Sequence, residues 1–136
     1  MKRVVLTSSC VAIFGDSVDT KCLTEADWGD AEKSEGYTKS KILAEKAAWD
    51  LLEERKKNNE SVFELAVINP SLVMGPVLSK APGTSAAIFS MAFANKSDKP
   101  ISNMYMPMCD VRDVALAVSV FFIKKIFCGY FFILNK

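Results

Sequence analysis

The sequence contains no histidine, and this absence removes several common catalytic and metal-binding arrangements. Ser-His-Asp triads, Cys-His pairs and zinc sites that need an imidazole ligand are excluded. The four cysteines form no Cys-x-x-Cys pair, so the sequence indicates neither a metal knuckle nor a dithiol redox motif. Any acid–base chemistry therefore falls to tyrosine, lysine, carboxylate or thiol groups.

An excess of either charge is also missing. The chain has 136 residues with 17 Lys and Arg against 16 Asp and Glu, a net charge of +1, and half of its residues are apolar. This composition is typical of a globular domain, and without a basic patch nucleic acid is not an expected partner. The amino terminus lacks the apolar run of a signal peptide, and the cysteine spacing suits reduced thiols. We therefore expect a cytoplasmic protein.

The apolar pattern alternates between buried strands and a long helix. Residues 3–9 and 61–69 are β-branched runs typical of strands buried on both faces, and Pro70 ends the second run. Between them, residues 36–57 carry apolar side chains at helical spacing. Strand, helix and strand in this order predict a βαβ unit with a parallel sheet. A second helix, rich in small residues, is expected over 84–95.

Tyr37 and Lys41 lie four residues apart on the first helix, so their side chains share one face. Alone, such a pair is more typical of a solvated surface than of a catalytic site. A free phenol has a pKa of about 10, which a nearby ammonium lowers by favouring the phenolate. Ser9 ends the preceding strand, at the sheet edge where open α/β folds place ligands, with Ser8 as the alternative hydroxyl. A serine there could hold a carbonyl oxygen while the phenol exchanges a proton, and a cofactor would have to supply hydride.

Four motifs in this order resemble the extended short-chain dehydrogenase/reductase family. They are Thr7-Ser8-Ser9, Tyr37-Thr38-Lys39-Ser40-Lys41, Asn69-Pro70-Ser71-Leu72-Val73-Met74-Gly75-Pro76 and Asp110-Val111-Arg112-Asp113-Val114-Ala115. The branch they resemble contains dihydroflavonol-4-reductase-like and ketone or methylglyoxal reductase-like enzymes. The resemblance covers residues 1–117. It implies a partial Rossmann-type, doubly wound parallel α/β sheet, with the C-terminal half of the cofactor domain and part of the substrate region.

The resemblance also implies roles for individual residues. The catalytic set is Ser9 as holder of the substrate oxygen, Tyr37 as acid/base, and Lys41 as the group that tunes the phenol and binds the nicotinamide ribose. The implied cofactor-binding set is Tyr37, Lys41, Pro70, Leu72, Val73 and Ser85. Strand termination is the alternative role for the proline loop, and helix capping is the alternative for Ser85. NADPH is the implied cofactor, with NAD as the alternative, and no metal is implied. The family's Arg112–Asp113 pair is interpreted as a structural ion pair.

Two features depart from the family. The six glycines never approach G-x-G-x-x-G or G-x-x-G-x-x-G spacing, so the turn that receives a pyrophosphate at a helix start is absent. After residue 117 the sequence no longer resembles the family. It continues as an apolar segment, 118–136, which we treat as a separate tail. A genuine tail, a membrane anchor and intron read-through are three interpretations. Lys124 and Lys125 in mid-span disfavour the anchor.

Together these observations predict an NAD(P)-dependent oxidoreductase that acts on a ketone, aldehyde or secondary alcohol. In the resemblance, plant flavonoid reductases carry a substrate-binding Asn at the position of Phe14, so an apolar ketone, aldehyde or sterol-like alcohol is expected instead of a flavonoid. A sugar-nucleotide epimerase or dehydratase, which shares Tyr-x-x-x-Lys, is the alternative activity. An inactive truncated product is the alternative outside enzymology. The resemblance implies that the rest of the sheet, which would pack against these strands, is absent. We therefore expect exposed strand edges, weak stability and little or no turnover from the isolated chain.

Overall fold

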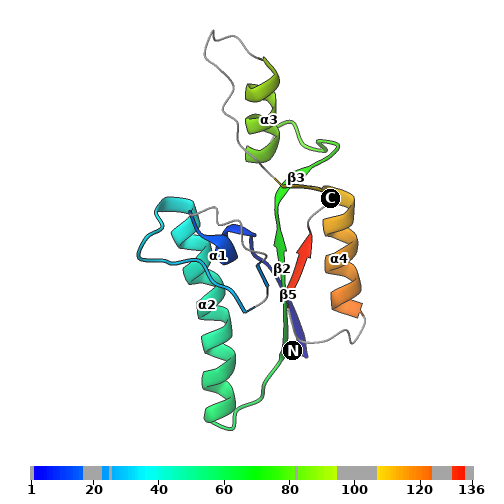
Figure 1. The fold of residues 1–136 in the computed structure, drawn as a ribbon. Coiled ribbons are helices and arrows are strands. Elements are labelled where there is room, and N and C mark those ends of the chain that lie inside the picture. Colours follow the sequence, from blue (N-terminus) through cyan, green and yellow to red (C-terminus); the bar gives the residue numbers. More distant parts are fainter. Residues whose placement is uncertain are drawn as a thin grey trace.

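The computed structural model describes residues 2–16, 23–24, 26–81, 83–94, 107–123 and 130–133. In chain order the described elements are β1 (Arg3–Thr7), α1 (Val11–Phe14), α2 (Gly36–Lys57), β2 (Glu64–Pro70), β3 (Leu72–Met74), α3 (Thr84–Ala94), β4 (Met108–Asp110), α4 (Val111–Ile123) and β5 (Tyr130–Ile133) (Figure 1). The βαβ unit expected from the sequence is therefore present as β1, α2 and β2.

Two parallel sheets organise the described elements. The larger sheet has the strand order β1-β2-β5, with Arg3 beside Glu64 at one end and Pro70 beside Ile133 at the other. The smaller sheet pairs β3 with β4, so that Val73 lies beside Cys109. Parallel pairing joined by a crossover helix confirms the prediction of a partial Rossmann-type sheet.

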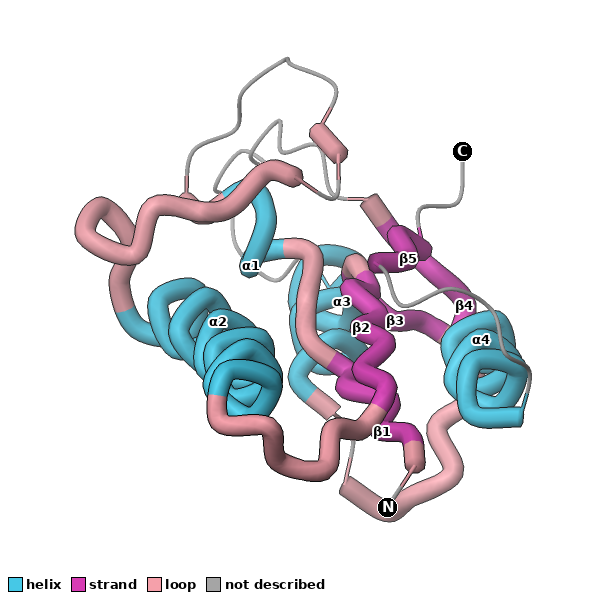
Figure 2. Tube along the Cα trace, turned by 90° about the horizontal axis from the view of Figure 1, so that it is seen from below, coloured by secondary structure: helices cyan, strands magenta, loops and turns pink. Residues whose placement is uncertain are grey.

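Helices cover both faces of the larger sheet. α1 and α2 lie on one side of β2 and α4 lies on the other (Figure 2). Successive side chains of a strand point to opposite faces, so Leu65 and Val67 pack with Leu52 of α2. Ala66 and Ile68 form a second cluster with residues of β4 and α4. The apolar run of β2 does not alternate because the strand is buried on both faces.

The loop that follows α1 packs tightly against it. Gly15 has a φ of +67°, and a Cβ added at Gly29 would lie 2.9 Å from the Gly15 backbone. The Gly29 N–H donates to the Ala12 carbonyl at 3.0 Å. Farther along the loop, Lys46 Nζ of α2 lies 5.4 Å from the centroid of the half-buried Trp28 ring. These contacts hold α1 against α2, where the candidate site lies.

The described part of the 118–136 segment joins the fold. Residues 118–123 continue α4, so the expected boundary at residue 117 falls inside that helix. Residues 130–133 form β5, which pairs with β2 in parallel. Within the described residues, no helix has the length and hydropathy that a membrane span requires.

Candidate active site

Ser9 is the second residue after β1, where hydrogen bonds to the end of β2 continue the strand pairing. The Ser8 N–H donates to the Ile68 carbonyl at 2.8 Å, and the Cys10 N–H donates to the Pro70 carbonyl at 3.0 Å. The Ser9 residue is only 8% exposed. Its backbone is therefore held at the carboxyl edge of the sheet, as expected from the sequence.

Tyr37 and Lys41 occupy the first two turns of α2. Tyr37 is 62% exposed, and Lys41 Nζ lies 5.6 Å from the centroid of its ring. This is the range of a cation–π contact. The shared helix face that the spacing predicts is thus present in the structure.

A cavity of about 580 Å³ brings these elements together. Its lining includes Ser9 from the β1 end, Tyr37 from α2, Leu72 from β3 and Ser85 from α3. The remaining lining residues are Cys10, Val11, Phe14, Ser71, Thr84, Ile88 and Pro107. Four of the seven residues expected from the sequence therefore face one space, contributed by four separate parts of the chain.

The other three expected residues lie around this cavity without lining it. Lys41 lies beside it through its contact with the Tyr37 ring. Pro70 ends β2, and its carbonyl holds the Cys10 backbone. Val73 lines a neighbouring cavity of about 440 Å³, which Ser85 also lines. Ser85, in the first turn of α3, therefore borders both spaces.

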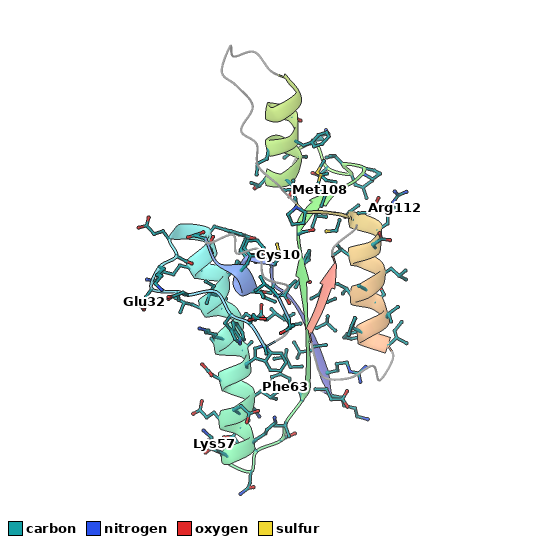
Figure 3. The ribbon with its side chains drawn as sticks, viewed as in Figure 1. Cys10, Glu32, Lys57, Phe63, Met108 and Arg112 are labelled. Carbon is teal, nitrogen blue, oxygen red and sulfur yellow. The ribbon has the colours of Figure 1, made fainter. Side chains whose placement is uncertain are left out.

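Cys10 is a lining residue that the sequence reasoning missed. It lies between α1 and β2 (Figure 3) and is 7% exposed. Burial raises the pKa of its thiol, and a hydrogen bond with Ser9 opposes this shift. Its position directly after Ser9 was the available signal.

The structure corrects the main partner of Arg112, which is Asp110, while the charge of Asp113 adds a smaller rise of the Arg112 pKa. Arg112, at the start of α4 (Figure 3), donates to Asp110 from Nε to Oδ1 at 2.8 Å and from Nη2 to Oδ2 at 2.6 Å. The Asp110 carboxylate also accepts the Arg112 backbone N–H at 2.8 Å. This guanidinium lowers the pKa of Asp110 to about 2. The pair closes the β4–α4 junction.

Two further polar residues meet beneath the site. Asn69 Nδ2 donates to Glu45 Oε2 at 2.8 Å and to the Ser9 carbonyl at 3.1 Å, and both Glu45 and Asn69 are 0% exposed. The sequence reasoning gave neither side chain a role. Glu45 follows Lys41 by four residues, and this spacing on the same helix face was a signal for it.

Fold and site together define a Rossmann-type protein with a serine, a tyrosine and a lysine at the carboxyl edge of a parallel sheet. No protein-family model matches the chain. The chain is 37% identical to the NADPH-dependent methylglyoxal reductase of Saccharomyces cerevisiae, over 92% of this chain and 40% of the relative. It is 35% identical to cinnamoyl-CoA reductase 1 of Arabidopsis thaliana, over 86% of this chain and 34% of the relative.

A solved structure agrees with these relatives. The crystal structure of Gre2 from Candida albicans aligns with a TM-score of 0.79 and 32% identity, covering 100% of this chain and 44% of that one. The chain belongs to the extended short-chain dehydrogenase/reductase family, in its dihydroflavonol-4-reductase-like branch. It spans less than half the length of the relatives it matches.

Proposed function

We propose that this chain is the catalytic segment of an NADPH-dependent reductase that acts on aldehydes or ketones. The observation that carries the proposal is the common cavity of Ser9 and Tyr37, with Lys41 against the Tyr37 ring. The similarity to an NADPH-dependent methylglyoxal reductase and to a cinnamoyl-CoA reductase supports a reductive reaction of this kind.

Each side chain of the trio has a separate part in this reaction. The Ser9 hydroxyl donates a hydrogen bond to the carbonyl oxygen and so fixes its position. The Tyr37 hydroxyl gives its proton to that oxygen as the alcohol forms. The Lys41 ammonium favours negative charge on the phenol during this transfer. Bound NADPH supplies the hydride that the carbonyl carbon receives.

The cavity suits the nicotinamide end of such a cofactor. Leu72 offers an apolar wall, while Tyr37 and Ser85 offer hydroxyls, in a space of about 580 Å³. Pro70 and Val73 belong to the same strand-end segment and complete the proposed cofactor-binding set with Lys41. The sequence supplies no glycine-rich turn for the pyrophosphate. The proposal for this chain therefore concerns the reacting end of the cofactor.

The rest of the lining favours a carbonyl compound with an apolar substituent. Val11, Phe14, Ile88 and Pro107 contribute apolar surface to the cavity that holds Ser9. Apolar pockets with a few placed polar groups are typical small-molecule sites.

We place the protein in the cytosol, because the described cysteines Cys10 and Cys109 are free thiols.

The test follows NADPH oxidation with a panel of aldehydes and ketones. The full chain is assayed alone, where slow turnover is expected, and within a hybrid in which it replaces the aligned region of the Saccharomyces relative. In the hybrid, Tyr37→Phe should lower kcat by about 10² to 10⁴-fold because the proton donor is lost. Ser9→Ala should lower kcat by about 10² to 10³-fold.

The matched control for Ser9 is Ser8→Ala, which removes the neighbouring hydroxyl of the same strand end. Its kcat should stay near that of the unmodified hybrid. Unchanged turnover in Tyr37→Phe would refute the proposed function. A larger loss in Ser8→Ala than in Ser9→Ala would transfer the oxygen-holding role to Ser8.

A further inference from the structure

Glu45 is an ionisable side chain enclosed in the protein core. Among the residues that the structure describes, it is the only Asp, Glu, Lys or Arg that is buried. It follows Tyr37 by eight residues on α2, a distance of about 12 Å along the helix axis. Tyr37, Lys41 and Glu45 are spaced four residues apart, so they lie on the same side of the helix in successive turns.

The Asn69 side chain connects Glu45 to the strand edge. Its Nδ2 group donates one hydrogen bond to Glu45 Oε2 and another to the Ser9 carbonyl, at 2.8 and 3.1 Å. The three residues come from α2, the end of β2 and the end of β1. We call Glu45, Asn69 and the Ser9 carbonyl the polar bridge. It is a direct link between the helix that carries Tyr37 and the residue that carries the Ser9 hydroxyl.

The polar bridge does not make a good stabilising contact, because it leaves polar atoms buried in the core. Glu45 Oε1 and Asn69 Oδ1 are buried acceptor atoms that have no hydrogen-bond partner among the residues the structure describes. Native proteins contain few such atoms, and apolar residues of similar volume often replace buried polar groups without loss of stability. A helix that only had to pack against the sheet could use a leucine at this position. The bridge is therefore better explained by a need to hold α2 at a fixed place against the strand edge.

We propose that Glu45 is a positioning residue, which through Asn69 sets the Ser9 hydroxyl against the Tyr37 phenol. This inference rests on the proposed function, since two groups must meet one carbonyl oxygen only if the reaction is carbonyl reduction. Tyr37 is 62% exposed and lies in the first turn of α2, so the position of this turn relative to the sheet decides where its hydroxyl lies. The bridge two turns later defines how far the helix extends past the strand edge.

The decisive variants are Glu45→Asp and Glu45→Gln. Aspartate keeps the carboxyl group but is one methylene shorter, so that group no longer reaches Asn69. Glutamine keeps an acceptor oxygen at the original reach and serves as the rescue. Glu54→Asp, at an exposed position of the same helix, is the matched control.

Two readouts are compared. In the isotope-labelled full chain, Glu45→Asp should shift the NMR signals of the Ser9 amide and the Tyr37 ring, whereas Glu45→Gln and Glu54→Asp should leave both in place. In the hybrid, Glu45→Asp should lower kcat by about 100-fold with KM for NADPH unchanged, the loss expected when reacting groups are misplaced by about 1 Å. Glu45→Gln should restore kcat.

Several outcomes would overturn the inference. One is a kcat in Glu45→Asp equal to that of Glu54→Asp. Another is a lower melting temperature with unmoved Ser9 and Tyr37 signals. Failure of both Glu45 variants to fold would assign the residue to stability alone. If Tyr37→Phe keeps full turnover, the proposed function fails instead, and the NMR signals still decide whether the bridge aligns the two residues.

Discussion

Ile68→Ala tests how much the packing of β2 contributes to the stability of the fold that positions the site. Ile68 is 0% exposed and belongs to the cluster between the sheet and α4. Its backbone pairs with Thr7, and its carbonyl accepts the Ser8 N–H at 2.8 Å, next to Ser9. The substitution removes three carbon atoms from a closed part of the core.

The expected loss follows from that burial. Three methylene-sized groups at about 0.8 kcal/mol each amount to about 2.4 kcal/mol of transfer free energy. The cavity left behind adds to this, so the total should be about 3 to 4 kcal/mol, within the range known for such truncations. Ordinary domains are stable by only about 5 to 15 kcal/mol. Because this chain is expected to be only weakly stable, the variant should lose most of its stability.

The assay is urea unfolding of the full chain followed by circular dichroism. Ile123→Ala is the matched control, because it is the same substitution at a residue that is 79% exposed at the end of α4. The control should change the free energy of unfolding by less than about 0.5 kcal/mol. Equal losses in the two variants would refute the packing described for β2, and so would a changed m-value without a shifted midpoint.

Three further predictions concern the site and its frame. Lys41→Met in the hybrid should lower kcat by at least about tenfold, since it removes the ammonium beside the phenol, while Lys39→Met two residues away should not; equal effects would contradict a specific role for Lys41. The pKa of Asp110 is lowered to about 2 by its guanidinium partner, so its stabilising contribution is present above the ordinary value of 3.8 and is lost as pH falls toward 2. Asp110→Asn should therefore flatten acid unfolding between those two pH values, and an unaltered acid titration would speak against the pair. Gly75→Ala should destabilise the chain by about 1 to 3 kcal/mol in urea unfolding, because φ is +146° and the new Cβ would lie 2.5 Å from a side-chain atom of α4. Gly83→Ala, with open space around it, is its control, and the idea fails if the two alanine variants unfold alike.

The sequence by itself determined the elements whose signal lies within one stretch of chain. The α2 helix spans Gly36–Lys57 as predicted, because apolar side chains at helical spacing are a signal within one stretch of chain. The β1 and β2 strands were also expected, although β2 begins at Glu64, three residues later than its apolar run. The shared face of Tyr37 and Lys41 follows from helical geometry alone.

Only the tertiary structure decided which elements and side chains distant in the sequence contact one another. β5 joins β2, and β3 pairs with β4, although their short apolar stretches carry no local sign of a partner. Arg112 takes Asp110 as its main partner, through its guanidinium and also through its backbone N–H. Glu45 becomes a bridge to the strand edge only because α2 packs with that face against β2. Contacts between distant residues depend on how elements pack, and local periodicity does not encode that packing.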